Sequence, residues 1–136
     1  MVIGIGTDLC DIRRIEKTLN RFGEKFVYRI YSDYEREKAK KNVSPASVYA
    51  KNFAAKEALS KALGTGFRFG VFWKNIEIRN HKSGKPYVVL SGGALLRLED
   101  ITPEGQNAII NLSLSDEYPL AHAMVTISTV CLENNL

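Results

Sequence analysis

Residues Asn52–Gly66 read NFAAKEALSKALGTG, and they predict the central helix around which the fold is built. The helix begins at Ser44-Pro45, because proline is favoured at the first helical position. It runs to about Leu63, where two glycines around a threonine end it. Its apolar stripe consists of Val48, Ala55, Ala58, Leu59, Ala62 and Leu63.

Three charged residues interrupt this helix of small, apolar side chains. Glu57 and Lys61 are four residues apart and therefore share one helix face, and Lys56 precedes Glu57. Residues 64–66, Gly-Thr-Gly, end the helix, and glycines there also expose backbone N–H groups that an anion can bind. The Walker pattern of an ordinary phosphate loop is absent from the sequence.

The segments before this helix predict one strand and two further helices. VIGIGTDL is short and β-branched, and predicts a buried first strand whose end delivers Asp8. Residues 25–32, KFVYRIYS, fit a helical turn or a strand equally well. The two helices are a first helix capped by Asp11 and ended by Gly23, and a charged helix over 33–41 capped by Ser32.

The segments after the central helix alternate in polarity and predict mainly strands. A hairpin turns at Ser83-Gly84, a short amphipathic helix covers 92–101, and two strands cover 107–117 and 121–133, with a polar turn at 116–119. We therefore expect residues 1–136 to form one α+β domain, with a mostly antiparallel sheet packed against the long central helix.

The composition is that of an ordinary globular protein, with 45% hydrophobic and 25% charged residues. The net charge of +4 suggests an anionic partner. A cytoplasmic protein is expected, because the N-terminus does not resemble a signal peptide and no segment is apolar enough to span a membrane. Cys10 and Cys131 are expected to be free, buried thiols, and the only histidines, His81 and His122, argue against triad or zinc chemistry.

Asp8 and Glu57 are the candidate metal ligands. A charge at the end of an apolar strand is unfavourable without a partner. Two carboxylates can hold Mg²⁺ and leave its other coordination positions for water and substrate phosphates. The alternatives are a turn or helix cap for Asp8 and a surface glutamate for Glu57. Lys61 either pairs with Glu57 within the helix or reaches a phosphate beside the metal.

The first helix carries a basic stripe on one face, formed by Arg14, Lys17 and Arg21. Such a stripe is often solvated surface, but it also suits the docking of an acidic protein, because charge complementarity raises association rates. Nucleic-acid binding is a further alternative, although no aromatic-interleaved recognition motif accompanies the stripe.

Two segments together resemble the small bacterial phosphopantetheinyl transferases, the holo-[acyl-carrier-protein] synthases. IGIGTDLCDIRRIE is similar to their G-x-D-x-x-x-x-x-R-x-E pattern at Gly6, Asp8, Arg14 and Glu16. FAAKEALSKALGTG is similar to their [FW]-[AS]-x-K-E-A-x-x-K-A pattern, at Phe53, Ala54, Lys56, Glu57, Ala58, Lys61 and Ala62. The later strands also resemble the family, so the similarity covers nearly the whole chain.

The resemblance implies the 4′-phosphopantetheinyl transferase fold and transfer of the 4′-phosphopantetheine arm of coenzyme A to a serine of apo-acyl carrier protein in fatty-acid biosynthesis. Adenosine 3′,5′-bisphosphate would be released. It implies that Asp8 and Glu57 hold Mg²⁺ against the pyrophosphate. Glu57, directly or through a water, is a candidate general base, but the sequence does not identify the base. The resemblance further implies a homotrimer with active sites between subunits. The residues expected to bind coenzyme A are Lys56, Lys61, Gly64, Thr65 and Gly66, with Lys61 also neutralising phosphate charge, and those expected to dock the carrier protein are Arg14, Lys17 and Arg21.

Two positions depart from the family pattern. Residues 113–117 read SLSDE where many members have S-x-T-H, and Asn52 stands where members often have an arginine that contacts the 3′-phosphate. Two other functions stay open: a non-catalytic basic module that binds nucleic acid or acidic protein, and a transferase acting on a carrier domain of secondary metabolism.

Overall fold

The computed structural model describes residues 1–132, and the predicted central helix is its α4 (Pro45–Ala62). Proline is its first residue, as predicted, and Leu63 is its C-cap. Small residues let neighbouring elements approach this helix closely, and most of its circumference is buried. All six residues of the predicted apolar stripe are buried.

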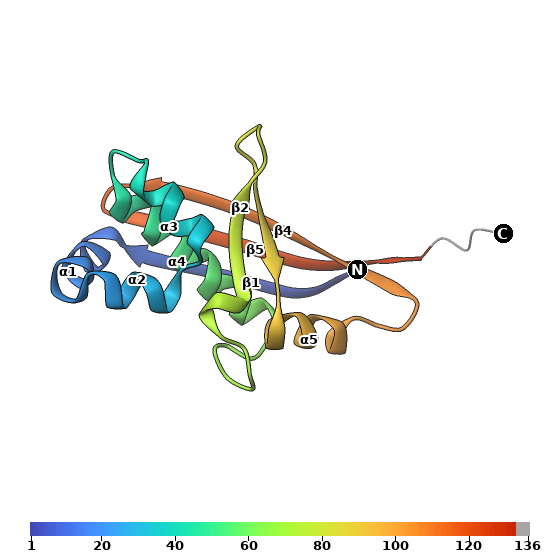
Figure 1. The fold of residues 1–136 in the computed structure, drawn as a ribbon. Helices are drawn as coiled ribbons and strands as arrows, with labels where there is room; N and C mark the ends of the chain where they lie inside the picture. Colours follow the sequence, from blue (N-terminus) through green and yellow to red (C-terminus); the bar gives the residue numbers. More distant parts are fainter. Residues whose placement is uncertain (133–136) are drawn as a thin grey trace.

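Two antiparallel sheets surround α4 (Figure 1). The larger sheet has the strand order β1 (Val2–Asp11), β5 (Leu120–Cys131), β4 (Gln106–Glu117), and α4 packs on β1 and β5. The smaller sheet is the predicted hairpin of β2 (Ile76–Asn80) and β3 (Pro86–Leu90). The α+β class with antiparallel sheets against a long helix is therefore confirmed.

Strand β1 lies directly against α4 because it carries glycines at the points of contact. A Cβ atom on Gly6 would lie 1.7 Å from the Ala58 carbonyl oxygen, and one on Gly4 would lie 2.3 Å from that of Ala62. No larger residue fits this approach. The glycines thus bring the backbone around Asp8 close to the middle of α4.

The remaining helices follow the predicted caps, and the ambiguous segment 25–32 is helical. Asp11 caps α1 (Ile12–Phe22) by accepting from the Arg13 N–H, and Gly23 ends it. Ser32 and Glu35 form a capping box on α3 (Asp33–Lys40). The other helices are α2 (Glu24–Ile30) and α5 (Gly92–Ile101). Within residues 1–132, none of the helices has the length and apolarity that crossing a membrane requires.

Several strand ends differ from those that the sequence indicated: β1 ends two residues later, β4 and β5 each begin one residue earlier, and β5 ends at Cys131. β1 continues to Asp11 because β5 pairs with it along its length, so Asp8 lies inside the strand, opposite Ala123. The turn between β4 and β5 contains only residues 118–119, because pairing persists to Glu117 and Leu120. The expectation that the first strand is buried was wrong for one of its faces, which stays open. Glu133, the last residue of the predicted final strand, lies outside the described residues.

Candidate functional site

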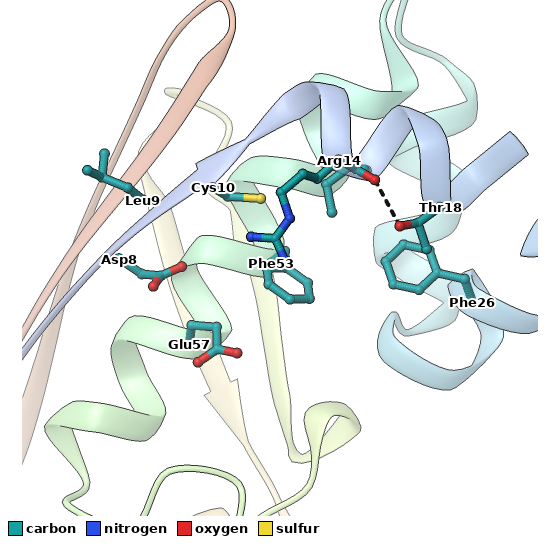
Figure 2. A pocket seen from close by; sticks show the side chains of 9 residues that line it. Asp8, Leu9, Cys10, Arg14, Thr18, Phe26, Phe53 and Glu57 are labelled. Carbon is teal, nitrogen blue, oxygen red and sulfur yellow. Dashed lines mark hydrogen bonds between the residues drawn. The ribbon is translucent and has the colours of Figure 1, made fainter. Parts of the chain in front are cut away.

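Asp8 and Glu57 line one cavity of about 340 Å³ between β1, α1 and α4 (Figure 2). Asp8 comes from the face of β1 that meets α4, and Glu57 comes from α4. The cavity walls are otherwise formed by Leu9, Cys10, Arg14, Ile15, Thr18, Phe26 and Phe53. The structure therefore brings the two candidate metal ligands together, although forty-nine positions separate them in the sequence.

The electrostatics of this pair favour a cation. Partial burial raises the pKa of Glu57, and the negative charge of Asp8 raises it further. Lys61 offsets part of this effect, with its Nζ donating to Asp8 Oδ1 and to the Thr7 carbonyl oxygen, both at 3.1 Å. The ion pair of Lys61 is thus with Asp8 on β1, and half of the Lys61 side chain (51%) stays exposed to meet a ligand.

The donor set of this cavity suits Mg²⁺. Among residues 1–132, no group of three or more His, Cys, Asp or Glu side chains could enclose a metal ion. Two carboxylates supply hard oxygen ligands and leave further positions for water and substrate phosphates, which is the coordination that Mg²⁺ prefers. The site fits an ion that is completed by its substrate.

Arg14 is placed differently from the other two residues of the basic stripe. Its side chain extends from the first turn of α1 into the cavity, between Cys10 and Phe53 (Figure 2). Lys17 and Arg21 are exposed on α1 outside the cavity wall. The basic stripe therefore consists of one residue in the cavity beside the carboxylates, Arg14, and two residues on the exposed surface of α1, Lys17 and Arg21.

Lys56 does not lie where the expected coenzyme A contact requires. Its side chain is fully buried, and its Nζ donates to Glu35 Oε1 at 2.9 Å and to the carbonyl oxygen of Trp73 at 3.1 Å. Burial lowers the pKa of Lys56, and the charge of Glu35 opposes that effect. Because its ammonium group is satisfied inside the protein, Lys56 offers nothing to a ligand in the cavity, and the cofactor assignment is corrected.

The Gly-Thr-Gly loop also uses its backbone differently from the expectation. The N–H of Gly64 donates to the Lys61 carbonyl, and that of Gly66 donates to the Ser60 carbonyl. Both glycines have positive φ, as helix-ending glycines do. These two N–H groups therefore cap α4 rather than face an anion. Gly64 and Thr65 line a separate cavity of about 580 Å³, together with Arg97 of α5.

Several wall residues were not singled out from the sequence. Cys10 is two residues after Asp8 on a strand, so alternation alone places it on the same face. Burial, and then the charge of Asp8, raises the pKa of its thiol to about 11. Cys10 and Cys131 are both free, but Cys131 is exposed rather than buried as expected. Ile15 and Phe26 come from two different helices, and no local pattern predicts that they meet.

A third cavity, of about 190 Å³, lies at the position where the sequence departs from the family pattern. Asn52 and two lysines, Lys38 of α3 and Lys51 of α4, are among its lining residues. Burial lowers the pKa of Lys38, and the positive charge of Lys51 adds to that effect. Lys51 Nζ also lies 3.3 Å from Asp116 Oδ1. Two cations converge here beside the amide that replaces the expected arginine.

Comparison with known proteins agrees with this fold and cavity. The sequence model of the 4′-phosphopantetheinyl transferase superfamily matches residues 4–122. A holo-[acyl-carrier-protein] synthase from Beijerinckia indica is 56% identical over 133 residues, which cover 98% of this chain and 95% of the relative.

Solved structures of similar proteins share the fold. The holo-[acyl-carrier-protein] synthase from Neisseria meningitidis has a TM-score of 0.82 and 37% identity, covering 94% of this chain and 99% of its own. The enzyme from Helicobacter pylori, in complex with coenzyme A, has a TM-score of 0.77 and 31% identity, covering 91% and 99%.

The α+β fold, with a carboxylate pair and a lysine around one cavity, is thus that of a phosphopantetheinyl transferase. The superfamily model matches residues 4–122, and about half of the aligned residues are identical in the curated relatives. The family can therefore be assigned specifically. The chain belongs to the holo-[acyl-carrier-protein] synthases of the 4′-phosphopantetheinyl transferase superfamily.

Proposed function

We propose that this protein transfers the 4′-phosphopantetheine arm of coenzyme A to a serine of apo-acyl carrier protein, in the cytoplasm and for fatty-acid biosynthesis. The serine oxygen bonds to the phosphorus that carries pantetheine, the bond from that phosphorus to the bridging oxygen breaks, and adenosine 3′,5′-bisphosphate leaves. The observation that carries the proposal is that Asp8 and Glu57 line one cavity, with Lys61 paired to Asp8, in a chain of this family.

Asp8 and Glu57 are the residues that would hold Mg²⁺, which supplies charge neutralisation at the phosphates when bound. Lys61 places a second positive charge next to Asp8 and neutralises phosphate charge during transfer. Phosphoryl transfer depends mainly on positioning and charge, so the site does not require a histidine. Glu57 accepts the serine proton directly or through a water.

The carrier protein docks on α1 in this proposal. Lys17 and Arg21 are exposed on the rim and suit an acidic partner, whereas Arg14 reaches into the cavity from the same helix (Figure 2). A carrier bound to this helix would present its serine next to Asp8 and Glu57. The charge-reversal pair Lys17→Glu and Arg21→Glu lies outside the cavity, so it is expected to raise the carrier KM and leave coenzyme A binding intact. An unchanged carrier KM would show that this face is only solvated surface.

A homotrimer is supported by the open face of the larger sheet. Four apolar residues of this sheet share the face opposite α4, namely Ile5, Leu9, Met124 and Ile109, and 62%, 64%, 46% and 41% of their surfaces are exposed. Apolar patches of this kind mark protein–protein contacts. Light scattering of the wild type should give three times the chain mass, and Ile5→Asp should give monomers; a monomeric wild type would refute the assembly.

The cavity at Asn52 is proposed to receive the 3′-phosphate, with Lys51 and Lys38 supplying the charge that arginine supplies elsewhere. Lys51→Met should raise the KM for coenzyme A but leave the KM for dephospho-coenzyme A, which lacks this phosphate, unchanged. An equal change for both substrates would place the phosphate elsewhere.

The transfer itself is tested by incubating the protein with apo-acyl carrier protein, coenzyme A and Mg²⁺ and measuring the intact mass of the carrier. We expect the mass of one phosphopantetheine to be added, and the addition to stop when a chelator removes the metal. If only a carrier domain of secondary metabolism were modified, the protein would be a transferase with a different acceptor from the one proposed. Salt-sensitive nucleic-acid binding without any transfer would favour the non-catalytic module instead.

A further inference from the structure

Lys56 and Glu35 form a fully buried ion pair that the transfer reaction does not use. Both side chains have 0% exposure, and Lys56 Nζ lies 2.9 Å from Glu35 Oε1. The carbonyl oxygens of Trp73 and Ile76 accept the other hydrogen bonds of the ammonium group. All three donors of the ammonium group are therefore matched by acceptors.

Glu35 is held as completely as Lys56. Its Oε1 accepts from the Ser32 backbone N–H at 2.8 Å, and its Oε2 accepts from that of Ile78 at 3.2 Å. The pair consequently joins α3, α4, β2 and the short 3₁₀ turn Trp73–Asn75. Within the described residues it is the point where these four elements share one polar network.

This network lies immediately behind the cavity of the proposed site. Lys56 is adjacent to Glu57, so any rotation of α4 that moves one side chain moves the other. Phe53, one helical turn earlier, lines the cavity and stacks on Trp73 at 4.8 Å between ring centroids. Trp73 in turn stacks on Phe67 at 3.8 Å. The residue whose carbonyl Lys56 binds thus supports the cavity wall.

Stability alone does not account for such a pair. Removing two charges from water is unfavourable enough that apolar residues of similar volume often stabilise a protein as well or better. What a buried, fully bonded pair supplies in addition is a unique arrangement of the elements that it joins, because few other arrangements satisfy every bond.

We propose that Lys56, with Glu35, is a positioning residue that fixes the rotation of α4, so that the Glu57 carboxylate and the Phe53 ring face the cavity. The proposal rests on the proposed function in so far as Glu57 acts there. It replaces the coenzyme A contact expected from the sequence with a role exerted through neighbouring residues.

The test is the double variant Lys56→Met with Glu35→Gln, which removes both charges and retains an amide oxygen that can accept from one of the two backbone N–H groups. We expect a folded protein whose kcat falls by about 10²-fold, because small displacements of reacting groups have effects of this size. The apparent Kd for Mg²⁺ should rise, and the KM for the carrier protein should not change, because α1 is untouched.

Fluorescence supplies a readout that does not depend on activity. Trp73 is the only tryptophan of the chain, and its carbonyl loses the Lys56 bond in the variant. Its emission and its response to added Mg²⁺ should differ from those of the wild type. The matched control is Lys40→Met with Glu37→Gln, which removes an exposed pair from α3 and should leave every one of these quantities unchanged.

Two results would overturn the inference: a folded double variant with wild-type kcat and Mg²⁺ dependence, or a double variant that does not fold, which would assign the pair to stability. The proposed function fails separately, if Glu57→Gln keeps wild-type transfer and Mg²⁺ dependence in the same assay.

Discussion

Lys56 and Glu57 are neighbours on one helix, and both are charged, but their surroundings are opposite. Lys56 faces the core, where its ammonium group meets a carboxylate and two carbonyl groups with no water access. Glu57 faces a cavity that it shares with another carboxylate, Asp8, whose negative charge raises the pKa of Glu57. The first environment satisfies its charge completely, whereas the second leaves a negative pair that a cation can complete. The helix thus carries a charge that is bonded inside the core next to a charge that faces the proposed site.

The comparison predicts that the core charge matters most for stability. Lys56→Met leaves Glu35 buried without a counter-charge, and the free energy of unfolding should fall by about 3–5 kcal/mol. Adding Glu35→Gln should restore most of this loss. Urea denaturation of the wild type, the single variant and the double variant measures both steps. If the single variant were as stable as the wild type, the Lys56–Glu35 ion pair would not be formed in solution.

The cavity charge should matter most for catalysis. Glu57→Gln removes a proposed ligand of the Mg²⁺ ion that would neutralise phosphate charge, so kcat should fall by about 10²–10³-fold, as with other lost electrostatic contributions to catalysis. Its free energy of unfolding should not decrease. Asp8→Asn removes the other proposed Mg²⁺ ligand, and it also removes the ion pair between Asp8 and Lys61. Steady-state transfer assays and urea denaturation on the same preparations test this contrast, which fails if Glu57→Gln is active or unfolded.

A smaller effect concerns pH in the metal-free protein. The folded-state pKa of Glu57 is raised above the ordinary value of 4.5 by burial and then by Asp8. The folded protein therefore binds this proton more tightly than the unfolded chain, and stability falls as pH rises from about 4.5 through the raised folded value. Glu57→Gln should remove this slope, and Mg²⁺ should reverse it because the bound cation favours the ionised carboxylate, as melting temperatures from pH 4 to 8 would show. Identical slopes in the wild type and the variant would contradict the assignment.

The smallest effect is expected for a charged pair on the surface. Lys40 Nζ and Glu37 Oε1 lie 3.5 Å apart on α3, with about two-thirds of each side chain exposed. Exposed pairs contribute between about 0.2 and 1 kcal/mol, so Lys40→Met with Glu37→Gln should change the free energy of unfolding by no more than this. A larger change would show that charge removal on α3 by itself disturbs the fold.

The sequence predicts most of the fold because local signals decide it. Proline at position 45, the caps at Asp11 and Ser32, and strand alternation each act within a few residues. The strand ends were missed because the pairing of β5 with distant strands decides them. The segment 25–32 stayed ambiguous because packing, rather than its own periodicity, makes it a helix.

The site was predicted in part for the same reason. Asp8 and Glu57 were paired as metal ligands on chemistry and resemblance, and the structure places them at one cavity. Lys56 was misplaced because helical spacing says which residues share a face but not how much of the helix is buried. Here α4 is enclosed on most sides, and the Lys56 face meets Glu35 from α3, a contact across twenty-one positions that no local pattern carries.

The most direct test of the account is to locate a metal ion in crystals grown with Mn²⁺, a substitute for Mg²⁺ that can be found by anomalous scattering. The account predicts one strong peak coordinated by both Asp8 and Glu57, with Lys56 still bonded to Glu35 behind it. The absence of a peak at these carboxylates, or a metal ion held elsewhere with Asp8 and Glu57 uncoordinated, would contradict it.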